Sequence, residues 1–297
     1  MSISLDQTAD AREAFDRIAA AMRPKLHRYC ARMTGSVIDG EDVLQEALVK
    51  AMEALPRTGA IDNLEGWLFR IAHNAALDFL RRRSRHEAVR ANEDPDMIVD
   101  PDSEQDRAIV AASLRTFMRL PVAQRGSVIL MDVLGYSLDE IGDIMDLTIP
   151  AVKAALHRGR TRLRQLAQEP DNAPRPIMAD ADRARLAAYV DRFNARDFDA
   201  VRAMLAEDVR LDLVAKLRLN GRGEVGNYFH NYARIKDWQL AAGFVDGHPA
   251  ALVRNPDDPS SAPYFVLLDW FGGRLVRIRD FRFARYATEG ADLVMIE

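Results

Sequence analysis

The chain has 297 residues, of which 48% are hydrophobic, and a formal net charge of −4. This length favours two or three domains with proper cores, and the negative balance means that any affinity for nucleic acid must come from local basic patches. The single cysteine, Cys30, excludes an internal disulfide and a cysteine-rich metal site, while the lack of a signal-peptide core or a membrane-length apolar run predicts a cytoplasmic protein with no membrane partner.

The first part of the chain, from about residue 10 to residue 85, is predicted to form three amphipathic helices. Apolar residues at helical spacing mark the first, starting at Phe15. The second runs from about residue 40 to residue 55 and ends before Pro56, and the third starts near Asn63. These patterns predict an all-α N-terminal domain.

The third helix carries a polar stripe opposite its apolar one, formed by Arg70, Asn74, Asp78 and Arg81. Asn can offer a donor and an acceptor to one base edge, and Asp can accept from a cytosine amine. Arg81 and Arg82 can hold phosphates. A solvated helix face with a basic C-terminus would show the same pattern, and this alternative stays open for the helix taken alone. A second basic helix later in the chain favours DNA contact.

Two segments are predicted to be linkers. Residues 91–106 hold seven acidic side chains and two prolines with little periodicity, which is typical of an acidic, flexible linker. Residues 169–180 contain three prolines and favour a stiff, extended linker. Helical patterns resume near Arg107 between them.

Two short helices joined by a tight turn are predicted within residues 138–166. Ser137 can cap the first, with Glu140 completing a capping box. Thr148 can cap the second, and Pro150 fits its first turn, where a missing N–H costs little. The apolar stripe of the second helix consists of Val152, Leu156, Gly159, Leu163 and Leu166.

The rest of this second helix is basic and contains no acid. Five cations lie off the apolar stripe: Lys153, Arg158, Arg160, Arg162 and Arg164. An ordinary solvated helix face mixes both signs of charge, so this pattern favours a helix-turn-helix that docks into the DNA major groove. A helical projection puts six residues nearest the groove floor: Pro150, Ala151, Ala154, His157, Arg158 and Thr161. Since three of them are small or apolar, phosphate contacts and DNA shape should matter more than direct base reading.

The remainder of the chain predicts a helix-then-sheet domain. Helices are expected at 181–194 and 198–205, and strands at 209–214, 239–245, 250–253, 264–270 and 275–286. Gly272 and Gly273 between two apolar runs indicate a hairpin. A curled antiparallel sheet behind helices predicts an α+β domain with a cone-shaped cavity.

Polar and aromatic side chains of this domain are candidates for lining that cavity: Asp212, Tyr232, Trp238, Asn255 and Trp270. A proton-transfer enzyme would need a cavity carboxylate and an oxyanion partner, roles for which Asp212 and Tyr232 or His230 are available. The alternative, which we favour, is a structural or ligand-sensing domain whose aromatic side chains fill the cone. We therefore predict no catalytic residue, no metal site and no cofactor.

Three segments resemble a known family. GEDVLQEALVKAMEAL followed by NLEGWLFRIAHNAALDFLRRR is similar to the second conserved region of extracytoplasmic-function (ECF) RNA polymerase sigma factors. LPVAQRGSVILMDVLGYSLDEIGDIMDLTIPAVKAALHRGRTRLRQ is similar to their fourth region. The last 117 or so residues resemble the SnoaL-like branch of the nuclear-transport-factor-two fold, and LNGRGEV and RNPDDP resemble segments linked to regulation in such extensions.

The resemblance implies roles by position. Glu41, Asp42, Gln45 and Glu46 would bind the clamp of the largest subunit of core polymerase, and the flap of the second-largest subunit would be a further contact. Asn74 and Asp78, with Arg70, Arg81 and Arg82 beside them, would read the minus-ten element, and the loop 56–65 would capture a flipped base. The helix from Thr148 to Arg162 would read the minus-thirty-five element. An anti-sigma factor or a small-molecule signal would be a further partner.

The sequence thus predicts a multidomain protein: two all-α sigma domains, the second with a helix-turn-helix, and an α+β cone-shaped SnoaL-like domain. The expected boundaries are 1–90, an acidic linker 91–106, 107–168, a Pro-rich linker 169–180, and 181–297. The predicted function is that of a sigma factor modulated in cis by its last domain. Two alternatives stay open: a stand-alone helix-turn-helix regulator, and an isomerase- or cyclase-like enzyme with an accessory DNA-binding half.

Overall fold

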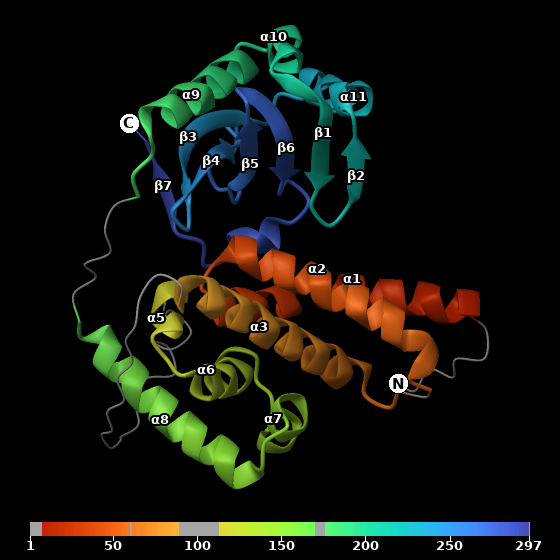
Figure 1. Ribbon diagram of the computed structural model, residues 1–297, viewed down its shortest axis with the longest axis vertical. Coiled ribbons are helices and arrows are strands. Elements are labelled where there is room, and N and C mark those ends of the chain that lie inside the picture. The colour runs from red at the N-terminus through yellow and green to blue at the C-terminus, as the bar shows by residue number, and fades with distance from the viewer. Residues whose placement is uncertain (1–7, 60, 89–112, 170–175, 297) are drawn as a thin grey trace. The chain divides into compact units, whose positions relative to one another are not determined.

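The computed structural model describes residues 8–59, 61–88, 113–169 and 176–296 (Figure 1). The chain divides into two compact units, Met1–Asp171 and Asn172–Glu297. The predicted acidic linker, 91–106, lies outside the described residues, as do residues 170–175 of the predicted Pro-rich linker. The proposed domain boundaries therefore stay predictions.

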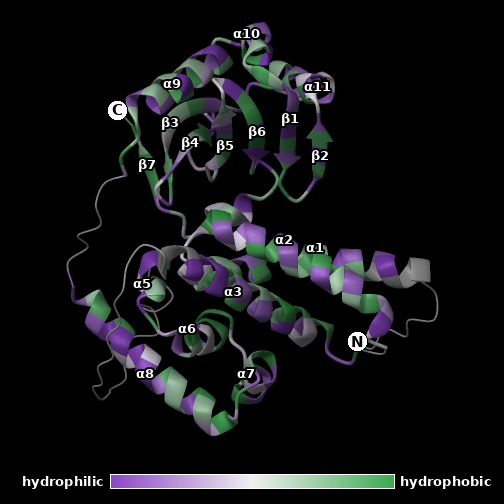
Figure 2. Ribbon diagram, in the orientation of Figure 1, coloured by the Kyte–Doolittle hydropathy of each residue, from purple (hydrophilic) through white to green (hydrophobic). Residues whose placement is uncertain are grey.

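The regular elements in the described ranges of the N-terminal unit are helices, as predicted. Its first helical part comprises α1 (Thr8–Thr34), α2 (Val37–Ala54), the 3₁₀ turn η1 (Leu55–Arg57) and α3 (Leu64–Ala88). Its second helical part comprises α5 (Leu114–Met118), α6 (Val122–Val128), the π-helical turn η2 (Ile129–Val133), α7 (Leu138–Met145) and α8 (Ile149–Ala167). Hydrophobic and hydrophilic bands alternate along α2, α3 and α8, as amphipathic helices require (Figure 2).

The two helical parts share one hydrophobic core, which runs from Phe15 on α1 to Leu166 on α8. A buried arginine joins them: Arg125 on α6, only 4% exposed, donates to the carbonyl oxygen of Met33 on α1. The same guanidinium donates to the carbonyls of Met118 and Leu120, at 3.2 and 2.9 Å. Burial lowers the pKa of Arg125 to about 10. One side chain thus satisfies three backbone carbonyls, and this fixes the two parts against each other.

The helix-turn-helix formed as predicted. Ser137 and Glu140 make the capping box of α7, and the Thr148 hydroxyl accepts from the backbone N–H of Ala151 at the start of α8. Asp146 ends α7 in the left-handed region, at φ 55°. The predicted apolar stripe of α8 is confirmed, because all five of its residues are buried. The projection was wrong at Thr161, which is buried and not at the exposed face.

The C-terminal unit places three helices beside one curved sheet (Figure 1). The helices are α9 (Asp180–Asn194), α10 (Phe198–Ala203) and α11 (Arg222–Arg234), and a 3₁₀ turn, η3, spans Arg285–Thr288. The strands are β1 (Leu205–Leu213), β2 (Leu217–Asn220), β3 (Gln239–Val245), β4 (His248–Arg254), β5 (Tyr264–Phe271), β6 (Arg274–Asp280) and β7 (Leu293–Met295). The α+β class predicted for this domain is confirmed.

The sheet order is β2-β1-β6-β5-β4-β3-β7. All neighbours are antiparallel except β1 and β6, which are parallel, so the expectation of a wholly antiparallel sheet was wrong. The strand predicted at 275–286 ends at Asp280, because Arg282 and Phe283 form a turn that is closed by a hydrogen bond from the N–H of Ala284 to the carbonyl of Phe281. Sequence patterns also missed α11, which follows Gly221, and the short edge strands β2 and β7. None of the helices in the described ranges combines the length and apolar content needed to cross a membrane.

One close backbone approach in the N-terminal unit provides a test of this packing. A Cβ atom placed on Gly40 of α2 would lie 2.6 Å from the backbone N and Cα of Ala31 on α1. We expect Gly40→Ala to lower the free energy of unfolding by about 1–3 kcal/mol, because the two helices must separate. Gly223→Ala on α11, where a new Cβ would meet nothing within 4 Å, is the control and should change stability by less than about 1 kcal/mol. Urea denaturation measures both, and equal stability of the two variants would contradict the close approach.

Candidate nucleic-acid interface

The solvent face of α8 carries the cations that the sequence predicted. Lys153, His157 and Arg158 are exposed, and the buried stripe on the other side of the helix packs into the shared core. Thr148, which caps the helix, lies at its exposed N-terminal end. This arrangement leaves a positively charged face directed away from the protein, which suits contact with the phosphates on either side of a major groove.

Two of the predicted cations have protein partners. Arg160 forms a two-pronged ion pair with Asp132 on η2, with Nε 2.9 Å from Oδ2 and a second contact between Nη2 and Oδ1. The Asp132 side chain is only 4% exposed, so the pair fixes where the Arg160 guanidinium lies. Arg162 donates to Oε1 of Gln165 at 3.2 Å, and Arg164 is half-buried. Of the five predicted cations, Lys153 and Arg158 are therefore the most exposed.

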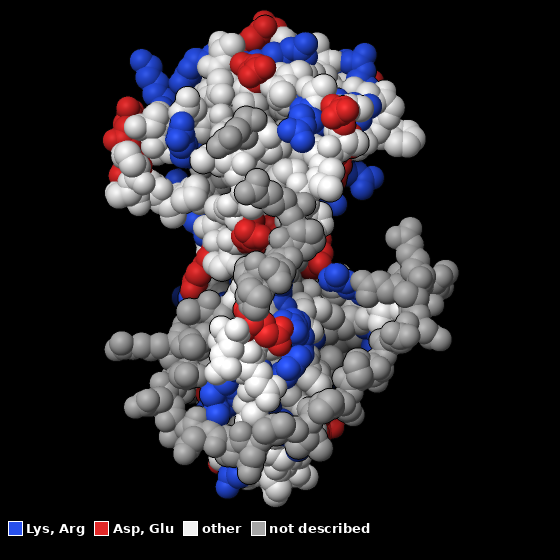
Figure 3. Space-filling model, turned by 90° about the vertical axis from the view of Figure 1, so that its left-hand side faces the viewer, with Lys and Arg blue, Asp and Glu red and all other residues white. Residues whose placement is uncertain are grey.

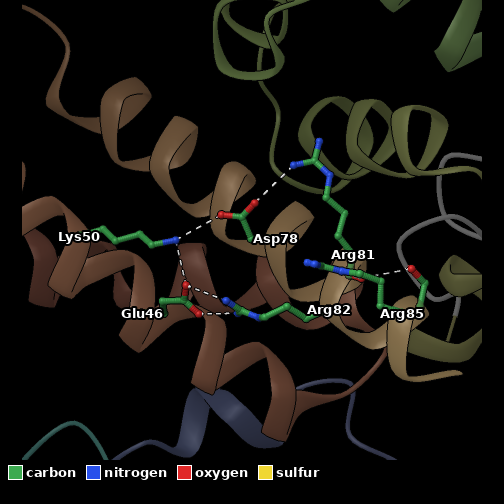
Figure 4. A network of polar contacts seen from close by, with 7 residues as sticks. Glu46, Lys50, Asp78, Arg81, Arg82 and Arg85 are labelled. Atoms are coloured by element: carbon green, nitrogen blue, oxygen red, sulfur yellow. Dashed lines mark hydrogen bonds and ion pairs between the residues drawn. The ribbon is translucent and has the colours of Figure 1, made fainter. Parts of the chain in front are cut away.

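The predicted polar stripe of α3 divides in two. Arg70 and Asn74 are exposed in the first half of the helix. Asp78, Arg81 and Arg82 take part in a network of ion pairs with α2 (Figure 4). Asp78 lies 3.3 Å from Nη1 of Arg81 and 3.4 Å from Nζ of Lys50. The stripe thus lies on one helix, as predicted. In its C-terminal half the charges of Asp78 and Arg82 are balanced by Lys50 and Glu46 of α2, which the sequence pattern did not indicate.

Glu46 connects this network to the predicted polymerase-binding face of α2 (Figure 4). Its carboxylate accepts from Arg82 at 2.7 Å and pairs with Lys50 at 2.8 Å. The hydrogen bond from Arg82 lowers the pKa of Glu46, and the same contact raises the pKa of Arg82. All four charged groups are partly exposed, so each pair contributes only a fraction of a kcal/mol, typically about 0–1. Partners that offer stronger contacts can therefore replace these pairs.

One of the four α2 residues predicted to bind polymerase, Glu41, is buried. Glu41 has no exposed surface: its carboxylate pairs with Arg23 and accepts from Nε2 of Gln45 at 3.2 Å. The assignment of Glu41 to polymerase binding stays a prediction, and in this structure its carboxylate is buried and balances the charge of Arg23. Asp42 is exposed, and Gln45 and Glu46 are half-buried.

The predicted ligand cavity of the C-terminal unit is not assembled from the residues that the sequence singled out. Tyr232 and Trp238 do meet, with ring centroids 5.7 Å apart. Asp212 lies instead 3.7 Å from Nε of Arg218, and Asn255 makes a turn after β4 by accepting from the N–H of Asp257. Trp270 is half-buried at the margin of the core. These five side chains were predicted to line one cavity, and the structure distributes them over four places.

Aromatic side chains fill the inside of the curved sheet. The ring of Phe193 on α9 lies 5.0 Å from that of Trp238, 5.1 Å from that of Tyr232 and 6.1 Å from that of Phe229. Such edge-to-face packing stabilises a core. This arrangement favours the interpretation in which the aromatic residues fill the cone.

A buried carboxylate that the sequence analysis missed lies among these rings. Both oxygens of Asp280, at the end of β6, accept hydrogen bonds: Oδ2 from the hydroxyls of Tyr228 and Tyr232, each at 2.7 Å, and Oδ1 from the N–H of Arg282 at 2.8 Å. Burial raises the pKa of Asp280, although these hydrogen bonds partly offset it. The available signal was an acid two residues after the apolar Ile278, and therefore on the same face of the strand, which the overlong strand prediction concealed.

No cluster of three or more His, Cys, Asp or Glu residues that could hold a metal ion occurs within the described ranges. On the face shown in Figure 3, positive and negative side chains are interspersed over the C-terminal unit. The surface of this unit therefore lacks, on that face, the single-sign patch that α8 presents in the N-terminal unit.

Comparisons with known proteins match both helical parts. Residues 18–86 match the family model for Sigma-70 region 2, and residues 114–163 match that for Sigma-70 region 4. The chain is 32% identical over 166 residues to the ECF RNA polymerase sigma factor SigE of Mycolicibacterium smegmatis, a match that covers 54% of this chain and 64% of that protein. It is 33% identical over 155 residues to the ECF RNA polymerase sigma factor SigM of Mycobacterium tuberculosis, covering 52% of this chain and 78% of that protein.

Among solved structures, the crystal structure of the extracytoplasmic-function sigma factor SigJ of Mycobacterium tuberculosis is similar over 88% of this chain and 94% of that chain, with 20% identity and a TM-score of 0.35.

The buried carboxylate gives a prediction for pH. Because the folded state raises the pKa of Asp280, it retains a proton at pH values where the unfolded chain has lost it, so this group lowers stability as pH rises from the usual carboxyl range toward neutral. Asp280→Asn should remove that part of the slope, and Asp269→Asn, at an exposed position on β5, should keep it. Urea unfolding followed by tryptophan fluorescence between pH 4 and pH 8 measures it. An unchanged slope in Asp280→Asn would rule out this assignment.

Proposed function

The chain belongs to the ECF family of RNA polymerase sigma factors, which direct transcription initiation, and we propose that it does so by reading promoter DNA with α3 and α8 while α2 binds core polymerase. The observation that carries the proposal is α8. It is capped by Thr148, held by a buried stripe, and presents Lys153 and Arg158 to solvent. Two separate basic helices on one chain suit two separate promoter elements.

The minus-thirty-five element is assigned to α8. Arg158 is proposed to donate to a base edge, and its exposure beside His157 supports this role. Arg160 and Arg162 are held by Asp132 and Gln165, so they suit fixed phosphate contacts better than adaptable base reading. Lys153 and Arg164 complete the proposed phosphate contacts.

The minus-ten element is assigned to α3, with Arg70 and Asn74 as the exposed readers and Asp78, Arg81 and Arg82 further along. The loop 56–65 is proposed to capture a flipped base.

Core polymerase is assigned to α2. Basic groups on the clamp of the largest polymerase subunit are proposed to meet Asp42, Gln45 and Glu46, because complementary charge favours fast and specific association. The flap of the second-largest subunit is proposed to contact the second helical part. A protein with these partners acts in the cytoplasm.

For the C-terminal unit we propose regulation in cis without catalysis. The packing of Phe193, Tyr232 and Trp238 inside the curved sheet supports this, since these aromatic rings contact one another there. An isomerase- or cyclase-like activity is the second candidate, and the observation that favours it is the buried carboxylate of Asp280 with its two tyrosine donors. An anti-sigma factor or a small molecule would act as the signal.

Run-off transcription with purified core polymerase tests the proposal. The chain with core should initiate at discrete promoters on a random-sequence DNA library, whereas core alone should not. A stand-alone helix-turn-helix regulator would bind operator DNA tightly without core and would not support initiation. Failure to initiate from any template, together with failure to bind core, would overturn the proposed function.

Two arginines on α8 separate base reading from phosphate contact. Arg158→Ala should reduce discrimination between promoters that differ in the minus-thirty-five element, costing about 1–3 kcal/mol on the preferred sequence only. Arg164→Ala should weaken all promoters alike and reduce the slope of log affinity against log salt by about one. Holoenzyme binding to a panel of minus-thirty-five variants at several salt concentrations measures both. An equal loss on every sequence for both variants would contradict these roles.

Removal of the last unit tests regulation in cis. We expect a chain that ends at Pro170 to differ from the full chain in run-off transcription from the selected promoter, because the regulatory unit is gone. Binding to core, measured in parallel, controls for folding of the shortened chain. Transcription that is identical for the two chains would remove the regulatory role.

A further inference from the structure

The strands of the C-terminal unit turn two arginines away from its aromatic core. Val209 and Leu211 on β1 belong to that core, so Arg210 between them points to the other side of the sheet. Arg277 on β6 precedes the core residue Ile278 and points to that side as well. Both arginines are exposed. A positive charge therefore lies on each of two neighbouring strands, on the side of the sheet opposite to the core.

These two arginines lie directly opposite each other. Strands β1 and β6 pair in parallel, and their register places Arg210 beside Arg277. Like charges in such positions repel each other and disfavour the pairing of the strands. Among the described residues, no ion pair or side-chain hydrogen bond involves either guanidinium, although Asp269 on β5 lies across from Arg277. The sheet thus keeps two adjacent positive charges that nothing in this unit neutralises.

A third cation extends this surface, which we call the arginine face (Arg210, Arg218 and Arg277). Arg218 on β2 is exposed and lies opposite Asp212, which is on the same side of β1 as Arg210. Its Nε is 3.7 Å from the carboxylate of Asp212, too far for a hydrogen bond. The arginine face spans three neighbouring strands, which together are about 10 Å across. It belongs to the β2 end of the sheet (Figure 1), whereas Figure 3 views the molecule from the β7 side.

The surroundings of the arginine face favour a polyanion over a protein surface. The residues next in register to Arg210 and Arg277 are Asn220 and Asp269, and both are exposed. Stable protein interfaces are built around buried aromatic or aliphatic anchors, which this polar row does not offer. Duplex DNA presents a dense row of phosphates, and a width of about 10 Å is the rise of about three nucleotides on one strand. Arginine donates to phosphate oxygens in fixed pairs of hydrogen bonds without reading bases.

We propose that the arginine face binds the phosphate backbone of duplex promoter DNA, so that the C-terminal unit makes a third DNA contact besides those of α3 and α8. This inference rests on the proposed function, which makes promoter DNA a partner of the chain. It gives a reason for two arginines side by side, because phosphates relieve the repulsion between them. The contact adds affinity on every promoter and carries no sequence preference.

Removal of both unpaired charges tests this contact. The variant Arg210→Gln with Arg277→Gln, in the full chain with core polymerase, is compared with the unmodified holoenzyme on a promoter selected from the random library. Each lost phosphate contact lowers the slope of log affinity against log salt by about one, so this slope should fall by about two, and affinity near physiological salt by about tenfold or more. The loss should be equal on promoters that differ in the minus-thirty-five element.

Two controls separate a DNA contact from a change in net charge or in folding. Arg183→Gln with Arg192→Gln removes the same charge from two exposed, unpaired arginines of α9 and should leave the slope unchanged. Arg210→Lys with Arg277→Lys keeps both charges and should restore the slope, because lysine holds phosphate as a point charge. The slope is independent of the fraction of folded chain, so a merely structural effect of the glutamines would not lower it.

The outcomes distinguish this inference from the proposed function. If the unmodified chain initiates with core, and the glutamine variant of the arginine face keeps the slope of the α9 control, the face does not bind DNA and the inference is overturned. If that variant instead loses affinity for core in the absence of DNA, an acidic protein surface occupies the face, which overturns the inference as well. If no form of the chain binds core or initiates, the proposed function itself has failed, and the inference fails with it.

Discussion

The buried guanidinium of Arg125 is the interaction on which the N-terminal unit depends most. It lies between two sets of helices that are far apart in the sequence, and it satisfies carbonyl groups on both sides. Burying a charge is costly unless hydrogen bonds compensate for it, so this side chain specifies one relative placement of α6 and α1. The shared core and the position of α7 over α3 follow from that placement.

The charged groups of the N-terminal unit differ in how firmly they are held. Glu41 and Asp132 are buried, so their partners, Arg23 and Arg160, are fixed. Glu46, Lys50, Asp78 and Arg82 are partly exposed, and each of their pairs is weak enough for a partner to replace. The firm pairs shape the helices that carry the proposed interfaces. The weak ones lie on the surfaces that polymerase and DNA are proposed to occupy, where exchange of partners costs little.

The C-terminal unit is held together differently from the N-terminal unit. Its core consists of packed aromatic rings around one buried carboxylate, Asp280, whose hydrogen bonds come from Tyr228, Tyr232 and the backbone of Arg282. Such a network fixes β6 against α11 because a half-satisfied carboxylate in this position would be strongly unfavourable. A rigid unit of this kind suits a regulatory attachment to the DNA-reading helices, as proposed here.

What the sequence alone determined was local. The caps at Ser137 and Thr148, the buried stripe of α8 and the exposed cations Lys153 and Arg158 follow from residue spacing within one or two helical turns, where the 3.6-residue period decides what is buried. The helical class of the first unit and the α+β class of the second follow from the same periodicities, and the residues of the motifs, with their order and spacing, carried the resemblance to sigma factors.

Only the tertiary structure decided which charges meet. Burial of Glu41 against Arg23, capture of Arg160 by Asp132, the bond between Tyr136 and Glu65, and the tyrosines around Asp280 all join residues from different elements. The parallel pairing of β1 with β6 is equally non-local. Sequence spacing cannot indicate such contacts, because a side chain's partner across an interface depends on how whole helices and strands pack and not on the residues beside it.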